Sequence, residues 1–185
     1  ADGAKRGSAL LNEGCEAKNA DSCRLLGAAL LEGLGVTRDR VRATSAFARA
    51  CELGRDADCA VAGELLRSGR GGLRDVKRAK QLLERGCDLG NGASCTELGN
   101  MARDGDGVAK DAARAGHLYQ RACDVGDPVG CGQLGGMLQT GEGLPKDPER
   151  AATLFAKACE RNVALACTSL GVMLAAGAPP GKTPT

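Results

Sequence analysis

The sequence is poor in aromatic side chains: among its 185 residues it has one Tyr, two Phe and no Trp, so aromatics make up 2%. That scarcity argues against a single thick core, because large buried rings supply much of the apolar volume of ordinary globular cores. A thin core of Leu, Ala and Gly is still available to a repeat protein, since each repeat needs to cover only its neighbours.

Histidine, long apolar runs and excess charge are also missing. The single histidine, His117, is interpreted as a surface residue, because a zinc site combines several ligands. No apolar run reaches the roughly 18 residues of a membrane span, and residues 1–15 show no signal-peptide pattern, so an exported chain has already lost its signal. The net charge of +2 is far below that of most nucleic-acid-binding chains. We therefore expect no metal, no cofactor, no nucleic acid partner and no membrane span.

The motifs of serine β-lactamases and penicillin-binding proteins are absent as well. These enzymes use Ser-x-x-Lys with Ser-Asp-Asn and Lys-Thr-Gly, and the nearest fragment here, Lys182-Thr183-Pro184, lacks the glycine. Glycine-rich segments such as 69–72 have no preceding strand, so they are interpreted as helix ends and not as phosphate-binding loops. No catalytic residue is predicted.

Cysteine, by contrast, is abundant and regularly spaced. The ten cysteines form five pairs eight positions apart, and the first member of each pair lies 36 residues after the one before: Cys15 and Cys23, Cys51 and Cys59, Cys87 and Cys95, Cys123 and Cys131, Cys159 and Cys167. A strict period of this length indicates a repeat array. Because no cysteine is left over, we predict five disulfides and hence a periplasmic or secreted location; zinc would need closer cysteine pairs and further ligands.

Glycine and aspartate recur within the same period. One glycine lies four residues after each second cysteine, inside a helical pattern, which indicates close approach of a neighbouring helix: Gly27, Gly63, Gly99, Gly135 and Gly171. A second glycine ends that helix, and an aspartate in the N-cap position begins the next one: Asp39, Asp75, Asp111 and Asp147. The position held by Phe47, Leu83, Tyr119 and Phe155 is predicted to pack between successive repeats.

The expected fold is therefore all-α, with two helices in each repeat. The helix after each cysteine pair, called the A helix, is predicted near 20–32, 56–68, 92–104, 128–140 and 164–176. The helix before each pair, the B helix, is predicted near 7–17, 39–53, 75–89, 111–125 and 147–161, and residues 1 to about 6 form a polar start. Residues 1–177 are expected to make one solenoid, followed by a Pro-rich flexible tail at 178–185.

The run from Cys95 to Cys123, with Gly99, Gly105 and Asp111 in phase, closely resembles the Sel1-like repeat, a relative of the tetratricopeptide repeat. The cysteine pair in each repeat resembles that of the Helicobacter cysteine-rich proteins. The resemblance covers about residues 7–177 and implies a right-handed α/α solenoid that binds a protein or peptide on its concave face. It also implies an alternative function, penicillin binding or weak β-lactamase activity. We expect a monomer.

Two surfaces are candidates for binding. Positions 1, 5 and 8 after the second cysteine share one arc of each A helix and change between repeats; we call them the variable arc. Its binding candidates are Arg24, Glu64, Arg67, Thr96, Asn100, Arg103 and Gln139. Exposed positions also vary without function, and both interpretations stay open. The second surface is the arginine ladder, a row that suits an anionic polymer or, alternatively, pairs with the capping aspartates: Arg42, Arg78, Arg114 and Arg150.

Overall fold

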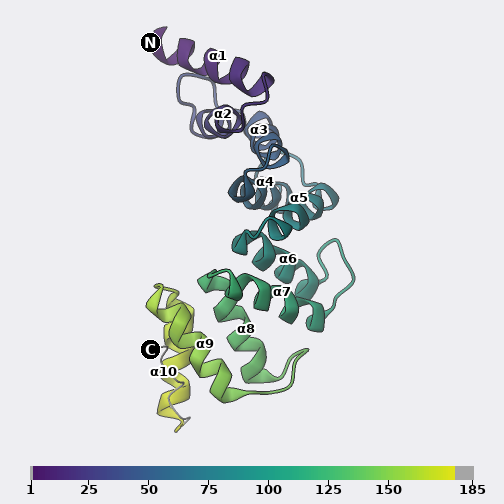
Figure 1. Cartoon of the computed structure of the whole chain (residues 1–185), viewed down its shortest axis with the longest axis vertical. Helices are drawn as coiled ribbons and strands as arrows, with labels where there is room; N and C mark the ends of the chain where they lie inside the picture. Colours follow the sequence, from purple (N-terminus) through teal and green to yellow (C-terminus); the bar gives the residue numbers. More distant parts are fainter. Residues whose placement is uncertain (1, 178–185) are drawn as a thin grey trace. The chain divides into compact units, whose positions relative to one another are not determined.

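The computed structural model describes residues 2–177, which form ten α-helices and no strand (Figure 1). The B helices are α1 (Asp2–Glu16), α3 (Arg40–Glu52), α5 (Val76–Asp88), α7 (Ala112–Asp124) and α9 (Pro148–Glu160). The A helices are α2 (Ala20–Glu32), α4 (Asp56–Ser68), α6 (Gly92–Asp104), α8 (Pro128–Thr140) and α10 (Ala164–Ala175). The all-α prediction is confirmed, and every predicted boundary except the start of the first helix lies within a residue of the observed one.

The chain divides into two compact units, residues 1–94 and 95–185, and each is described by itself. Within residues 1–94, each helix from α1 to α5 packs against the next, and α7 to α10 do the same in the second unit (Figure 1). The expectation of one solenoid over residues 1–177 stays a prediction. The predicted tail at 178–185 lies outside the described residues.

The predicted N-caps at the four aspartates are confirmed. The Asp39 carboxylate accepts a hydrogen bond from the backbone N–H of Arg42 at 3.0 Å, and the other three aspartates bond the equivalent N–H at 2.9–3.0 Å. The first N–H groups of a helix have no partner inside the helix, so a carboxylate at this position fixes where the helix begins.

The predicted helix ends at recurrent glycines are also confirmed. Gly33 and Gly141 follow α2 and α8 with φ of 79° and 83°, a left-handed conformation in which a β-carbon is strained. The N–H of Gly33 bonds the carbonyl of Ala29 at 2.8 Å, which satisfies one of the last free carbonyls of the helix. The chain then turns toward the next B helix.

The glycine inside each A helix makes room for the large side chain of the following B helix. A β-carbon at Gly99 would lie 2.5 Å from the ring of Tyr119, and one at Gly63 would lie 2.5 Å from the side chain of Leu83. Phe47 and Phe155 meet Gly27 and Gly135 in the same way, at 3.0 Å. The prediction of close approach at this position is confirmed for these four repeats. The few large side chains pack in the contact between each A helix and the B helix that follows it.

The predicted start of the first helix near residue 7 is wrong, because α1 begins at Asp2. Residues 4–6 are Ala, Lys and Arg, which all favour helix. The loop after α2 supports this first turn: the hydroxyl of Ser8 donates to the carbonyl of Lys5 at 2.8 Å and to that of Gly35 at 3.4 Å. A β-carbon at Gly35 would collide with the Ala4 carbonyl, so the loop backbone rests directly on α1. Because the two residues lie some 30 positions apart, no local sequence pattern predicts this contact.

Four of the predicted disulfides join a B helix to the A helix that follows it. Bridges with Cα–Cα distances of 4.5–4.7 Å link Cys15 to Cys23, Cys51 to Cys59, Cys123 to Cys131 and Cys159 to Cys167. Cys87 and Cys95 are disulfide-bonded as well, and no described cysteine is free. Each of these bridges spans the short turn between two helices and therefore restrains the angle between them.

Candidate functional site

Within residues 1–94, the predicted arc residues are half-buried on the A helices. Glu64 and Arg67 lie on α4, and Arg24 lies on α2. The Glu64 carboxylate pairs with the guanidinium of Arg70, and the carbonyl of Arg67 accepts a hydrogen bond from Nε of Arg74 at 2.9 Å. The Nε atoms of Arg24 and Arg67 are buried, so part of each guanidinium lies against the chain. This placement suits contact with a partner, and it leaves the recurrent Leu and Ala positions to the core.

In the second unit, Thr96 has a structural role that the sequence did not reveal. It is 4% exposed, and its hydroxyl donates to the Asp127 carboxylate at 2.5 Å. Asp127 in turn caps α8 by accepting the backbone N–H of Gly130 at 3.0 Å. Because its hydroxyl is buried and already bonded, Thr96 is not included in the binding surface proposed below.

Asn100 and Arg103 are half-buried on α6, and both lie close to Tyr119. The Tyr119 hydroxyl donates to Oδ1 of Asn100 at 2.8 Å, and Nε of Arg103 pairs with the Asp104 carboxylate at 3.0 Å. The hydrogen bond to Asp104 raises the pKa of Arg103 above its ordinary value. Two arc residues are thus held by partners in the same unit, and the only tyrosine of the chain ties one of them to the core.

Tyr119 is expected to titrate far above an ordinary tyrosine. Burial, opposed by the charge of Arg103, raises its pKa from 10.0 to about 12. Since the raised pKa belongs to the folded state, its stabilising contribution is complete below pH 10 and is lost as the pH rises through 12. Two pKa units correspond to about 3 kcal/mol of unfolding free energy.

The measurement is the near-ultraviolet absorbance of tyrosinate during rapid pH jumps on the oxidised protein. Trp is absent and Tyr119 is the single tyrosine, so the signal has one source. The same chain in concentrated denaturant should titrate near pH 10 and serves as the control. A native midpoint near 10 would show that the ring is solvated.

A pocket between α8 and α10 lies on the variable arc of the second unit. It has a volume of about 180 Å³, and three of its lining residues are arc positions: Gly132, Gly136 and Gln139. The nearest neighbours of a β-carbon at Gly132 would be 3.8 Å away, and a β-carbon at Gly136 would meet nothing within 4 Å. The missing side chains therefore create the hollow. The sequence contains the signal, since the other A helices carry larger residues at one or both positions, but the neighbouring walls could not be predicted.

The pocket is lined by both apolar and polar side chains. Val129, Phe155 and Leu165 contribute apolar surface, while Gln133 and Ser169 join Gln139 in offering amide and hydroxyl groups. Leu165 is 72% exposed, so this apolar surface is reachable from solvent. Such a combination of an apolar hollow with a few polar groups is typical of binding pockets.

The arginine ladder is exposed, and at Arg42 and Arg78 the arginine side chain is not tied to the capping aspartate. Each aspartate bonds the backbone N–H of the arginine, and among residues 2–177 no ion pair joins Asp39 to Arg42 or Asp75 to Arg78. Arg150 instead donates to the side chain of Gln120 on α7. The expected i, i+3 ion pair is therefore not formed at Arg42 and Arg78, where the aspartate holds the helix start through the backbone N–H of the arginine. The anionic-polymer hypothesis stays a prediction.

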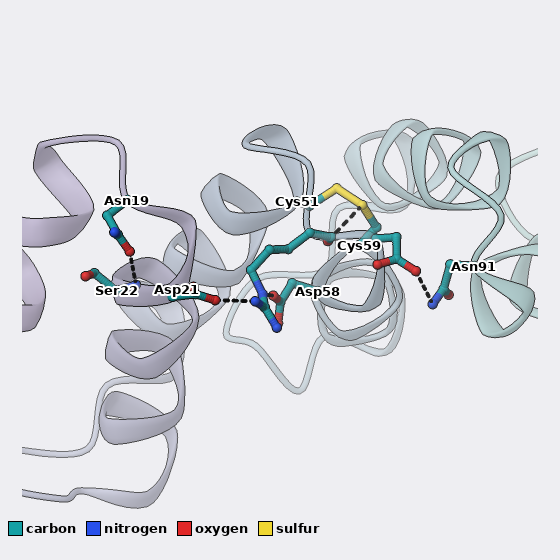
Figure 2. Close-up of polar contacts among 9 residues, drawn as sticks. Asn19, Asp21, Ser22, Cys51, Asp58, Cys59 and Asn91 are labelled. Atoms are coloured by element: carbon teal, nitrogen blue, oxygen red, sulfur yellow. Dashed lines mark hydrogen bonds and ion pairs between the residues drawn. A yellow bond between two sulfur atoms is a disulfide. The ribbon is translucent and has the colours of Figure 1, made fainter.

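A row of polar contacts joins successive A helices at their N-terminal ends, and sequence reasoning missed it. Arg55 pairs with Asp58 at 2.8 Å and with Asp21 of the preceding repeat (Figure 2). Asn91 donates to Asp56 at 3.4 Å. The hydrogen bond to Asp58, which is 3% exposed, raises the pKa of Arg55.

The residue four positions after the first cysteine contributes to this row in three repeats, as Arg55, Asn91 and Asp127. Figure 2 shows that Asn19 caps Ser22, and Asn91 and Asp127 act likewise in their repeats. Arg55 makes no side-chain cap and uses its charge between repeats instead. The 36-residue spacing shows that this position recurs. It does not predict the contacts, because the residue at this position bonds a different side chain in each repeat.

The described part of the chain offers no group of three or more His, Cys, Asp or Glu placed to hold a metal ion. His117 is exposed on α7. None of the helices found in residues 2–177 is both long enough and apolar enough to cross a membrane.

Similarities to solved structures follow the same repeat pattern. A protective antigen of uropathogenic Escherichia coli with an SLR fold matches with a TM-score of 0.83 and 28% identity; the match covers 92% of this chain and 36% of the antigen. A Sel1 repeat protein of Oxalobacter formigenes matches with a TM-score of 0.78 and 25% identity over 87% of this chain and 66% of that one. This chain thus spans about a third of the antigen.

Cysteine rich protein B of Helicobacter pylori is similar too, with a TM-score of 0.60 and 31% identity over 72% of this chain and 96% of that protein. A comparison with curated proteins finds no match. The Sel1 repeat pattern matches four consecutive segments, residues 20–54, 56–91, 92–127 and 128–163. With helix pairs, glycine contacts and cysteine pairs in phase over these segments, the chain belongs to the Sel1 repeat family.

Proposed function

We propose that this chain is a periplasmic or secreted scaffold that binds an extended segment of a partner protein on the variable arc of its A helices. The observation that carries the proposal is the pocket between α8 and α10, since three arc positions form part of it. Recurrent positions such as Leu134 and Met137 are buried on the same helix. The helix thus separates residues that hold the fold from residues that are accessible to a partner.

The size and chemistry of the pocket favour one apolar side chain of a bound segment. Its volume of about 180 Å³ is close to that of an engineered cavity, about 150 Å³, that takes up benzene. Gln133 and Gln139 also line the pocket, and their amide groups can bond the peptide groups on either side of the inserted residue. A Leu, Met or Phe with free backbone groups beside it fits this arrangement.

Charged residues lie on the variable arc of each unit. Glu64 and Arg67 lie on α4 of the first unit, and Arg103 lies on α6 in the second unit, which also holds the pocket. Rim charges of this kind change specificity and association rate more than total affinity. The location of the scaffold is supported by the disulfides, which persist in oxidising compartments, and by the similarity to the Helicobacter pylori cysteine rich protein.

The experiment is a selection of phage-displayed random peptides on the oxidised full chain, followed by calorimetric titration of the enriched peptides. Gly136→Leu adds a large side chain to the lining of the pocket, and we expect it to weaken binding at least about tenfold, which is about 1.4 kcal/mol. Ala113→Leu adds the same side chain on the exposed surface of α7 and should leave binding unchanged.

Charge reversal locates the remainder of the contact. Arg67→Glu and Arg103→Glu should change which peptides are enriched, whereas Arg42→Glu and Arg78→Glu, on the ladder, should not. Equal binding by the Gly136→Leu chain, or peptides that respond only to the ladder variants, would contradict the proposal. Labelling with a fluorescent penicillin in place of peptide enrichment would favour the alternative function implied by the resemblance.

A further inference from the structure

The segments that lead from an A helix into the next B helix carry different charge in the two units. Residues 34–42 and 70–78, in the first unit, hold seven Lys or Arg and two Asp, for a net charge of +5. Their counterparts in the second unit, residues 106–114 and 142–150, hold four Lys or Arg and five acidic residues, for a net charge of −1. Because the whole chain has a net charge of only +2, its positive charge is concentrated in the two segments of the first unit.

Five of these cations are exposed and make no ion pair or side-chain hydrogen bond within residues 2–177: Arg38, Arg40, Arg42, Lys77 and Arg78. The aspartates of the same segments, Asp39 and Asp75, accept hydrogen bonds from backbone N–H groups at the starts of α3 and α5. The carboxylates therefore hold the helix starts, and the five cationic groups are available to anions outside the chain.

Two large apolar side chains lie among these cations. Val41 is 57% exposed and Leu73 is 85% exposed. A β-carbon at Gly72 would lie 2.4 Å from the side chain of Val41, so the loop that carries Leu73 rests on the first turn of α3. Since α3 and α5 are in contact and begin at the same point of successive repeats, their starts share one edge of the first unit. We call this group the basic edge: Arg38, Arg40, Val41, Arg42, Leu73, Lys77 and Arg78.

We propose that the basic edge binds the surface of a membrane that contains anionic phospholipids. Its five cations meet the phosphate groups, while Leu73 and Val41 enter the boundary between headgroups and acyl chains. Exposed apolar residues beside cations favour a lipid surface over a soluble anionic polymer, which has no apolar layer to receive them. The second unit lacks this combination, because Ala or Pro replaces Leu73 and Ala or Glu replaces Val41, at these positions: Ala109, Ala113, Pro145 and Glu149.

The test is co-sedimentation of the oxidised full chain with phosphatidylcholine vesicles that contain about 30% phosphatidylglycerol, at about 0.1 M salt. We expect binding to these vesicles and little binding to vesicles of phosphatidylcholine alone. One Lys or Arg at an anionic membrane surface strengthens binding about fivefold, so Arg42→Gln combined with Arg78→Gln should weaken it about 25-fold. Leu73→Ser removes apolar surface without changing charge and should weaken binding about tenfold.

The matched control combines Arg114→Gln with Arg150→Gln, which removes the same charge at the same repeat positions of the second unit and should leave binding unchanged. An equal loss in the two double variants would mean that binding follows net charge alone and would overturn the proposal. Absence of binding to the anionic vesicles would overturn it as well. Binding to dextran sulfate that is as strong as binding to vesicles, with no effect of Leu73→Ser on either, would overturn it in favour of an anionic polymer.

Discussion

Reduction of the disulfides is expected to unfold this protein at room temperature. Each bridge closes a loop of about nine residues, for which the chain-entropy model gives roughly 2.5 kcal/mol, so five bridges together contribute about 12 kcal/mol. Domains of this size are typically stable by about 5–15 kcal/mol. With aromatics at 2% of the sequence, the buried Leu, Ala and Met side chains have little surplus to replace that contribution.

The measurement is helical circular dichroism before and after reduction, together with intact mass under denaturing, non-reducing conditions. Two hydrogens are lost per bridge, so the oxidised chain should weigh about 10 Da less than the all-thiol chain. Removing Cys51 and Cys59, both fully buried, by double serine substitution should cost about 2–5 kcal/mol. The equivalent change at Cys159 and Cys167, which are half-exposed, should cost less. A reduced chain with unchanged helicity and the same denaturation midpoint would contradict the prediction.

Adding one methyl group at Gly99 is expected to destabilise the chain, whereas the same change at Gly171 is expected to stabilise it. Both glycines lie inside an A helix, four residues after the second cysteine. A β-carbon at Gly99 would be 2.5 Å from the Tyr119 ring, so the ring or the helix must move, at a cost of about 1–3 kcal/mol. At Gly171 nothing lies within 4 Å, and only the helix preference of Ala over Gly, about 1 kcal/mol, remains.

Urea denaturation of dilute oxidised Gly99→Ala and Gly171→Ala chains measures the two changes. Because the repeat position is the same, the helix-propensity gain is common to both, and the difference between them isolates the contact with Tyr119. In a Tyr119→Ala chain, which is itself less stable, the further change Gly99→Ala should cost less than it does in the unmodified chain, since the smaller side chain no longer collides. Equal effects at the two glycines would mean that the close approach of helices has no energetic consequence.

The periodic sequence was sufficient to predict most of the fold. A residue such as Asp39 specifies a helix start through its own carboxylate and an N–H three positions away, and Gly33 specifies a helix end through a backbone conformation that other residues avoid. Cysteines eight positions apart meet across one short turn. N-caps, helix-ending glycines and cysteine pairs each depend on residues close together in sequence, so the sequence pattern predicts them. Their recurrence every 36 residues strengthens the prediction.

The candidate site was less predictable, because its contacts join residues from different repeats. The residues of the variable arc lie on the A helices. However, the Thr96 hydroxyl is already hydrogen-bonded to Asp127, and the Asn100 side chain to Tyr119. Arg55 finds its partner in Asp21, 34 positions away. Such pairs depend on the spacing of neighbouring helices and carry no local pattern.

Packing between elements also settled the remaining features. α1 starts at Asp2 because a later loop rests on its first turn, and the pocket beside Gly136 exists because α10 supplies the facing wall. Local sequence sets backbone conformation through short-range sterics and hydrogen bonds, whereas burial and side-chain pairing arise only when distant segments are brought together, so these were visible only in the folded chain.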